Sequence, residues 1–381
     1  GNAKNNSENE VKIKKIHISN TNNNPQESKQ IKAMLASYRA IRTFWSIFFK
    51  THNVKVNMIW ERFDNHHIGV ADAIKDVGGI SVYWPLSFDS HRLISCNSDV
   101  DVAFCFSQYS ADLEKQTNSK SSYNIITGYP RDYSGPLLKK EAKKLRDKLR
   151  ANGAKKIVFV IDENSLDDSR WHTGHELQRE NYSYILDKVL EVPWLGVIFK
   201  PKRAIDLRRR LGPVADLLGK AEKTGRCFVY ESSGRHTTIA PPILAGLSAD
   251  ICIHGHLSAG TAALECALEG LPTLLIDREG VPYSKLYDLP GGKVIFKDWP
   301  SAIEATLEHF NTPEGITGFG DWSSIIDDFD PFRDGKAAYR MGTYLQWLIE
   351  GFENNLDREV IMANAAKRYK KQWGEDKVIT S

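Results

Sequence analysis

Residues 249–277 read Ala-Asp-Ile-Cys-Ile-His-Gly-His-Leu-Ser-Ala-Gly-Thr-Ala-Ala-Leu-Glu-Cys-Ala-Leu-Glu-Gly-Leu-Pro-Thr-Leu-Leu-Ile-Asp, and this stretch decides the fold. An apolar run at 251–253 ends in small and polar residues, and a segment of helical length follows at about 259–269. A glycine and a proline then stop the helix before a second apolar run at 273–276. The order predicts a strand, a loop, a helix and a second strand.

The loop places Ser258, Gly260 and Thr261 at the first turn of the expected helix. The backbone N–H groups of a first turn are unpaired and carry partial positive charge, which suits an anion such as a nucleotide phosphate. Glu265 lies one turn beyond Thr261 and points to the same side. The alternative is an ordinary parallel βαβ unit in which Gly260 only lets the helix pack closely.

Length and composition predict a globular protein. The 381 residues suffice for two domains, and 41% hydrophobic with 26% charged residues is an ordinary globular balance. A net charge of +3 is too small to predict a nucleic-acid partner. Five cysteines without metal-ligand spacing favour buried thiols in a reducing compartment. With no long apolar span or secretory signal in the sequence, we expect a cytoplasmic protein.

Two features bear on partners. Nine Lys and Arg residues crowd a helical segment and its exit at 139–156. Such a cluster either touches an anionic membrane surface or an acidic acceptor, or forms a solvated helix face, and both interpretations stay open. The chain begins Gly-Asn-Ala without an initiating Met, so further domains of a longer polypeptide are one expectation.

Alternating apolar runs predict an α/β protein of two Rossmann-like halves with a helical C-terminal tail. We expect a largely flexible segment at 1–28, an acceptor domain at 29–150, a donor domain at 151–310 and a tail at 311–381 that packs back across both. Parallel sheets would place ligands in a cleft between their carboxyl edges. The expected strands, with none after about residue 299, are 54–60, 80–84, 102–106, 123–126, 157–161, 196–199, 227–230, 250–253, 273–276 and 293–296.

An acidic loop follows the first strand of the second half and contains Asp162, Glu163, Asp167 and Asp168. Four carboxylates at the end of a strand can supply a nucleophile, a base or a metal site. The alternative is a solvated acidic loop that caps the next helix. No EF-hand spacing is present, and we expect no metal.

Basic residues follow the next strand. Lys200, Lys202 and Arg203 can neutralise a phosphate or a carboxylate, or they belong to a surface loop. The three arginines at 208–210 lie further along the following helix and are expected to face solvent. Arg235 lies in a segment that either binds a base or sugar or forms only a turn.

Two further groups can do acid–base or phosphate chemistry. His254 and His256 flank a glycine after a strand, where one of them either reaches a phosphate or is a buried structural histidine. In the first half, Glu61 and His66 are candidates for the general acid or base of an acceptor hydroxyl, and the alternative is a helix cap. Neither a G-x-S-x-G elbow nor a P-loop occurs.

Three blocks agree in order and spacing with a known enzyme family across roughly residues 155–280. The first block is a strand followed by Asp-Asp-Ser, where the family has Asp-Asp-Ala-Ser. The second block is Phe-Lys-Pro-Lys, where the family has Tyr-Lys-Pro-His. The third block is similar to the family's Ser-Leu-x-Gly-Phe-Glu-Ala-Leu-x-x-Gly. These blocks resemble the GT-B glycosyltransferases, in particular the retaining Kdo transferases of bacterial capsule and O-antigen (lipopolysaccharide) synthesis. They lie at 158–161 with 167–169, at 199–202, and at 256–261 with 265–270.

The resemblance implies a GT-B enzyme that transfers Kdo from CMP-Kdo, with no metal and no cofactor beyond this donor. An aspartate, here Asp167 or Asp168, would form a glycosyl-enzyme that an acceptor hydroxyl resolves. The acceptor would be a glycan or lipid-linked glycan at the inner face of the membrane. Lys202 stands where the family has His, and Thr261 where it has Phe, and both departures bear on the donor.

Within this interpretation the donor phosphate would lie near 258–261 and Lys200, and a sugar carboxylate would pair with Lys202, Arg203 or Arg235. One alternative is a phosphotransferase of the teichoic-acid type, which transfers a polyol phosphate from a CDP-linked donor. Another is a non-catalytic module of a larger synthase that binds a sugar nucleotide or a glycan.

Overall fold

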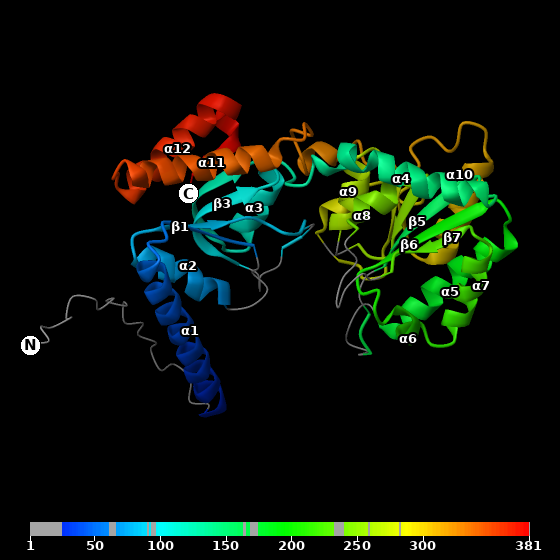
Figure 1. The fold of residues 1–381 in the computed structure, drawn as a ribbon, viewed down its shortest axis with the longest axis horizontal. Helices are drawn as coiled ribbons and strands as arrows, with labels where there is room; N and C mark the ends of the chain where they lie inside the picture. The colour runs from blue at the N-terminus through cyan, green and yellow to red at the C-terminus, as the bar shows by residue number, and fades with distance from the viewer. Residues whose placement is uncertain are drawn as a thin grey trace, which may run out of the picture. The chain divides into compact units, whose positions relative to one another are not determined.

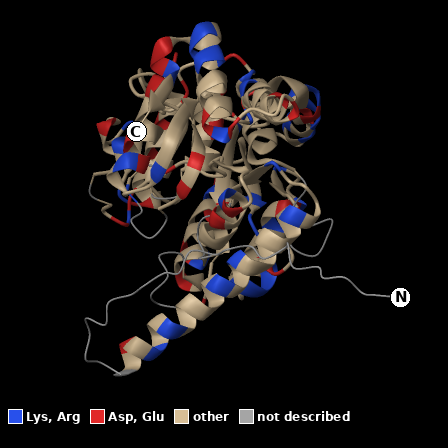
Figure 2. Cartoon of the chain, turned by 90° about the vertical axis from the view of Figure 1, so that its left-hand side faces the viewer, with Lys and Arg blue, Asp and Glu red and all other residues tan. Residues whose placement is uncertain are grey.

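The computed structural model describes residues 25–60, 66–89, 91–92, 97–162, 165–167, 174–231, 240–257, 260–281 and 283–380. These residues form two compact units, each with its own sheet (Figure 1). The first unit holds the described residues of 1–86, 92–130 and 337–381, and the second holds those of 87–91 and 131–336. Basic and acidic residues are interspersed along the chain (Figure 2).

The first unit contains a five-stranded sheet in the order β1 (Val56–Ile59), β2 (Ile80–Tyr83), β3 (Asp99–Cys105), β4 (Lys120–Ile126) and β11 (Val378–Thr380). Strands β1 to β4 are parallel, as predicted, and β11 pairs antiparallel with β4. The expectation that no strand follows residue 299 is therefore wrong. β11 is only three residues long, too short for the alternation that identifies a strand in sequence.

Helices cover both faces of this sheet. The apolar side chains of Ile80, Val82 and Phe104 pack against α11 (Ala337–Glu353) and α12 (Arg358–Trp373). On the other face, β3 packs with α2 (His66–Asp76) and α3 (Gln108–Gln116). A long helix, α1 (Pro25–Thr51), lies against α2.

The second unit contains a six-stranded parallel sheet. Its order is β10 (Ile295–Phe296), β9 (Thr273–Ile276), β8 (Ile251–His254), β5 (Lys156–Asp162), β6 (Leu195–Pro201) and β7 (Cys227–Val229). The chain proceeds from β5 toward β7 and then crosses to β8 on the other side of β5. The carboxyl ends of β5 and β8 therefore form the topological switch point, where open α/β sheets bind ligands.

The second unit is completed by seven helices among its described residues, which are α4 (Ser134–Ala151), α5 (His175–Glu191), α6 (Leu207–Leu211), α7 (Val214–Lys223), α8 (Pro242–Leu247), α9 (Thr261–Leu268) and α10 (Trp299–Asn311). α4 belongs here because Arg146 donates to the Ser248 and Ala249 carbonyls and Arg150 pairs with Asp250. The division thus falls before α4, whereas the sequence places it near residue 150. No helix in the described part of the chain is long and apolar enough to cross a membrane.

Candidate functional site at the switch point of the second sheet

A small pocket lies at the carboxyl ends of β5 and β8, where Ile161 and His254 are paired. Two of its lining groups are polar and buried and have no hydrogen-bond partner among the described residues, Trp299 Nε1 and Asn181 Oδ1. Buried polar groups are normally satisfied, so these offer one donor and one acceptor to a polar group in the pocket. The polar lining consists of Asp162, Gln178, Asn181, Tyr182, His256 and Trp299.

Asp162 ends β5 and is 7% exposed. Its carboxylate accepts hydrogen bonds from Gln178 Nε2 and, at 3.0 Å, from the Tyr182 hydroxyl. The Tyr182 ring stacks on Phe199, and burial, followed by the charge of Asp162, raises the pKa of Tyr182. Through these two hydrogen bonds Asp162 positions α5 against the end of β5.

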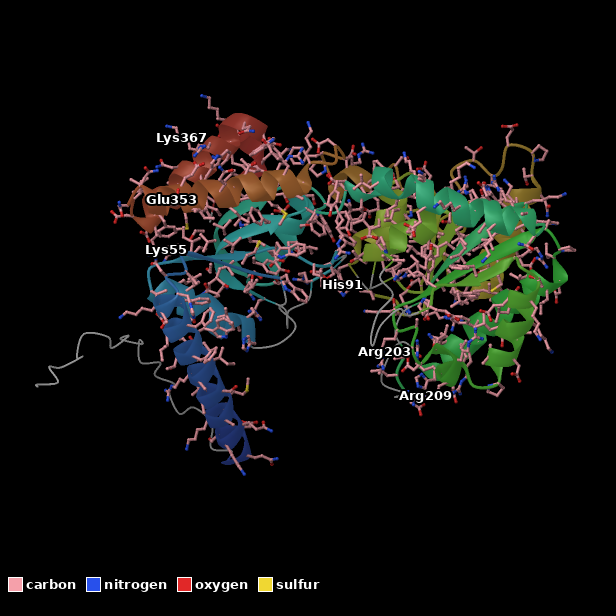
Figure 3. The ribbon with its side chains drawn as sticks, in the orientation of Figure 1. Lys55, His91, Arg203, Arg209, Glu353 and Lys367 are labelled. Carbon is pink, nitrogen blue, oxygen red and sulfur yellow. The ribbon has the colours of Figure 1, made fainter. Side chains whose placement is uncertain are left out.

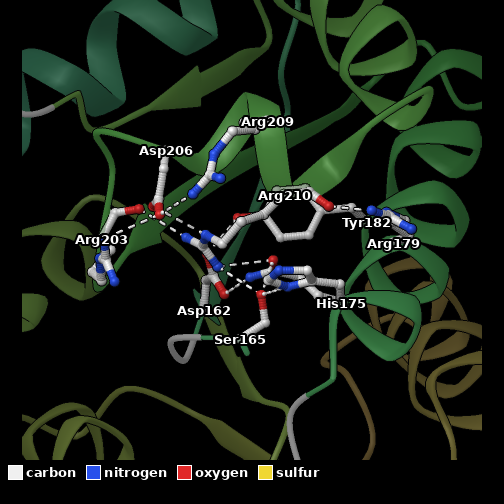
Figure 4. Close-up of polar contacts among 10 residues, drawn as sticks. Asp162, Ser165, His175, Arg179, Tyr182, Arg203, Asp206, Arg209 and Arg210 are labelled. Carbon is white, nitrogen blue, oxygen red and sulfur yellow. Dashed lines mark hydrogen bonds and ion pairs between the residues drawn. The ribbon is translucent and has the colours of Figure 1, made fainter. Parts of the chain in front are cut away.

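Arg210 joins three segments of the chain near Asp162 (Figure 4). Its guanidinium donates to Ser165 Oγ at 2.9 Å, to Gln178 Oε1 at 2.8 Å and to the Arg203 carbonyl at 2.7 Å. With an exposure of 2%, it contradicts the expectation that this arginine faces solvent. The reason is that α6 buries positions 207, 210 and 211, which share one helical face.

The acidic loop is held at its base by this network. Ser165 is buried, and its hydroxyl lies 2.8 Å from His175 Nδ1. Leu166 forms an isolated bridge with Gly174, so the two ends of the loop lie together. Asp167 is exposed, and Asp168 lies outside the described residues. Among the described residues, no group of three or more His, Cys, Asp or Glu side chains could hold a metal ion.

The basic loop begins at the end of β6. Lys200 is half-buried in the strand, and Lys202 is exposed. Arg203 is partly exposed and forms an ion pair of 3.1 Å with Asp206. Arg203 and Arg209 project from the loop and the short helix after β6 (Figure 3). The network thus brings the acidic and basic loops predicted from sequence to one edge of the sheet.

Both candidate histidines are buried. His254 Nδ1 lies 2.7 Å from the carbonyl of His256, an arrangement typical of a structural histidine. His256 lines the pocket, and its Nδ1 lies 3.0 Å from Glu279 Oε1, while Glu279 Oε2 accepts from the Leu257 N–H. Burial lowers the pKa of the nearby His91, with an opposing effect from Glu279. Glu279 was not predicted from sequence, although it follows a strand closely.

The start of α9 is covered by the segment 87–91, which belongs to the second unit. The Phe88 N–H donates to Thr261 Oγ1 at 2.8 Å, and a Cβ on Gly260 would lie 3.4 Å from the Phe88 ring. Glu265 is 6% exposed, and its Oε1 lies 3.9 Å from Arg131 Nη1. In this arrangement the Thr261 hydroxyl is already hydrogen-bonded to the chain. Ser258 lies outside the described residues.

One further candidate lies in the first unit, and two lie outside the described residues. His66 begins α2 in the first unit, and its Nε2 accepts a hydrogen bond of 3.1 Å from the Trp45 indole. Glu61 and Arg235 lie outside the described residues.

Comparison with known proteins supports the architecture. No family model matches the chain, and no curated protein matches its sequence. The co-structure of S. aureus MnaA with UDP matches with a TM-score of 0.54 at 10% identity, covering 83% of this chain and 82% of that one. A putative UDP-N-acetylglucosamine 2-epimerase from Listeria monocytogenes matches with a TM-score of 0.53 at 10% identity, over 85% and 82%.

The fold is GT-B-like. Two Rossmann-like parallel sheets with helices at the C-terminal end agree with the architecture predicted from sequence. In open α/β sheets of this kind, ligands bind at the topological switch point, which here is the carboxyl edge of the second sheet.

Proposed function

We propose that the protein is a glycosyltransferase that binds a sugar nucleotide at the carboxyl edge of the second sheet. One observation carries the proposal: the network of Asp162, Gln178 and Arg210 holds the base of the acidic loop, at Ser165, and the basic loop, at Arg203, beside a polar pocket at the switch point. The indole N–H of Trp299 and the amide of Asn181 supply directional hydrogen bonds there. Exposed cations and carboxylates from neighbouring loops are what transfer from an anionic donor needs.

The proposed donor is CMP-Kdo, which the sequence resemblance favours. Lys200 would contact the donor phosphate. Lys202 or Arg203 would contact the carboxylate of the sugar, and the guanidinium of Arg203 has the planar geometry that binds a carboxylate with two hydrogen bonds. Two solved proteins of similar fold are described with UDP or as a putative UDP-N-acetylglucosamine 2-epimerase. UDP-N-acetylglucosamine is therefore the comparison donor.

The proposed chemistry is a double displacement. The carboxylate of Asp167 or Asp168 bonds to the anomeric carbon as the bond from that carbon to the phosphate oxygen breaks, and CMP leaves with the electron pair. An acceptor hydroxyl then attacks the same carbon, its proton passes to a base, and the aspartate is released. The sugar therefore keeps its anomeric configuration.

The test is the intact mass of the protein after incubation with CMP-Kdo alone. We expect a mass increase of one Kdo residue, and we expect the Asp167→Asn, Asp168→Asn double variant to show none. Asp216→Asn is the matched control, because Asp216 is exposed on α7. Unchanged transfer to an acceptor by the double variant would contradict the aspartate role, and the absence of any thermal shift with CMP-Kdo and UDP-N-acetylglucosamine would contradict the donor site.

Parallel incubations with an acceptor and either CMP-Kdo or a CDP-linked polyol separate the alternatives. A phosphotransferase of the teichoic-acid type would yield an acceptor carrying a polyol phosphate from a CDP-linked donor. A non-catalytic module would bind the donor equally well before and after the double substitution and would form no product. Product mass and donor affinity, measured on the same preparations, therefore distinguish all three functions.

A further inference from the structure

The long helix α1 has one face buried in the first unit. Arg42 donates to both carboxylate oxygens of Asp76 at 2.6 Å, and the Tyr38 hydroxyl donates to Asp72. A Cβ on Gly69 of α2 would lie 2.8 Å from the Ile41 side chain, so the two helices approach closely there. This face therefore anchors α1 firmly to α2.

The opposite face of α1 is apolar and exposed. Three large apolar side chains lie on it, Phe44 at 60% exposed, Ile47 at 56% and Phe48 at 39%. Ala33, Ala40 and Ile47 lie seven residues apart, which is close to two turns, and Phe44 and Phe48 lie beside this row. The result is a continuous apolar strip, which we call the outer face of α1. Large exposed apolar patches of this kind mark interaction sites.

Basic residues run along one edge of the outer face. Lys32, Arg39 and Lys50 are exposed and share one side of the helix, because they are separated by about two and three turns. Glu27, in the first turn, is the one acidic residue of α1. Figure 2 shows the basic residues spaced along this helix with uncharged residues between them. The outer face thus combines apolar bulk with positive charge.

We propose that the outer face of α1 binds an anionic lipid membrane surface. Phe44, Ile47 and Phe48 enter the boundary between headgroups and acyl chains, while the basic edge contacts lipid phosphates. A second copy of the chain fits this face less well, since it would bring a second positive helix to a positive one. The helix lies in the plane of the interface and does not span the bilayer.

The basic cluster of α4 is a different surface. Its lysines are exposed, but Lys143 pairs with Asp147, and Leu137, 73% exposed, is the one large apolar side chain that this helix presents to solvent. Positive charge without an apolar strip gives only weak, salt-sensitive attraction to a membrane. α4 therefore fits a solvated helix face, and the outer face of α1 fits the membrane.

The test is co-sedimentation of the full chain with vesicles. We expect binding to vesicles made of equal parts of phosphatidylcholine and phosphatidylglycerol, and much weaker binding to phosphatidylcholine alone. The triple variant Phe44→Ser, Ile47→Ser, Phe48→Ser should lose about tenfold or more in vesicle affinity. Lys32→Gln, Arg39→Gln, Lys50→Gln should lose most of the preference for anionic lipid.

Matched variants decide between surfaces. Tyr339→Ser with Ile349→Ser removes comparably exposed apolar side chains from α11 and should leave vesicle binding unchanged. Lys139→Gln, Lys140→Gln, Lys144→Gln probes α4 and should have little effect. The proposal is overturned if wild type ignores anionic vesicles, if the α4 variant alone abolishes binding, or if the Phe44, Ile47, Phe48 variant instead dissociates a dimer in sedimentation velocity. Circular dichroism of each variant establishes that it is folded.

Discussion

The Asp206 carboxylate lies among three guanidinium groups, which belong to Arg203 at 3.1 Å, Arg209 at 3.3 Å and Arg210 at 3.1 Å. Burial alone would raise the pKa of Asp206, but Arg210 and then Arg203 outweigh burial and hold it below its usual value. Arg210 is nearly fully buried and needs this counter-charge. One carboxylate therefore keeps the buried centre of the site in place.

Replacing this carboxylate tests that role. We expect Asp206→Asn to lower the free energy of unfolding by about 1–3 kcal/mol at neutral pH. A carboxyl whose folded pKa is depressed stabilises above its unfolded pKa, and this contribution is lost as the pH falls below about 4. Urea unfolding of wild type and variant measures the free energy of unfolding at pH 7 and at pH 3, with Asp216→Asn as control. A difference between wild type and variant that is equally large at pH 3 would refute the ionic explanation.

The sheet edge that carries the candidate site could be predicted from sequence, and the contacts within the candidate site could not. Strand ends are readable from apolar runs, so the loops after β5 and β6 were placed correctly at one sheet edge. The partners of Asp162 lie on α5, 16 and 20 residues later, and their orientation depends on how that helix packs. Arg210 was misplaced for the same reason, because a helix of five residues gives no periodicity to read.

At the level of elements, buried parallel strands were the most predictable part of the chain. β5, β6 and β9 are continuous apolar runs and lie within two residues of their predicted bounds. The exposed apolar face of α1 could not be predicted, since only tertiary packing decides which apolar positions of a helix are covered. β11 was missed because its pairing with β4 bridges residues more than 250 positions apart.

The turn after α10 depends on the protonation of one histidine in that helix. His309 Nδ1 accepts a hydrogen bond of 2.9 Å from the Ile316 N–H, and its ring stacks on Phe319. Burial, followed by the charge of Lys156, lowers the pKa of His309. A depressed histidine pKa means that the unfolded chain binds the proton more readily, so stability is full above about 6.5 and falls as the pH drops.

We therefore expect His309→Gln to be about 1 kcal/mol less stable than wild type at pH 7.5, because the hydrogen bond from Ile316 is lost. The difference in unfolding free energy between wild type and the variant should become smaller from pH 7 to pH 5. Only wild type loses stability over this range, because only its unfolded chain gains a proton on His309. Thermal unfolding across this range, read by circular dichroism, measures this difference. A stability difference between wild type and variant that becomes larger on acidification would show that the charged ring is the stabilising form.

At the scale of the whole molecule, the first unit is assembled from two distant parts of the chain. Residues after 336 supply α11, α12 and β11, which cover one sheet face and extend its edge. Polar contacts support this packing, because the Tyr369 hydroxyl donates to the Ile126 carbonyl at 2.7 Å and Arg340 donates to the Thr127 carbonyl at 3.1 Å. The second unit is continuous except for the short segment 87–91.

This topology predicts how a shortened chain behaves. A chain of residues 1–336 would lose Tyr344, Leu348 and Tyr369 from the core of the first unit, leaving the apolar face of β2 and β3 exposed. The second unit would keep all its segments, including Phe88 against Phe329 at 4.4 Å between ring centroids. We expect calorimetry to show one cooperative transition from the second unit and none from the first.

Adding residues 337–381 as a separate peptide should restore part of the missing transition, since the lost contacts are side-chain packing that needs no covalent link. The matched control is full-length Tyr369→Phe, which keeps the ring but removes the hydrogen bond to Ile126 and should cost only about 1 kcal/mol. If the 1–336 chain still showed a calorimetric transition from the first unit, the four parallel strands would fold without α11 and α12. Aggregation that the peptide suppresses would instead agree with the exposed sheet face.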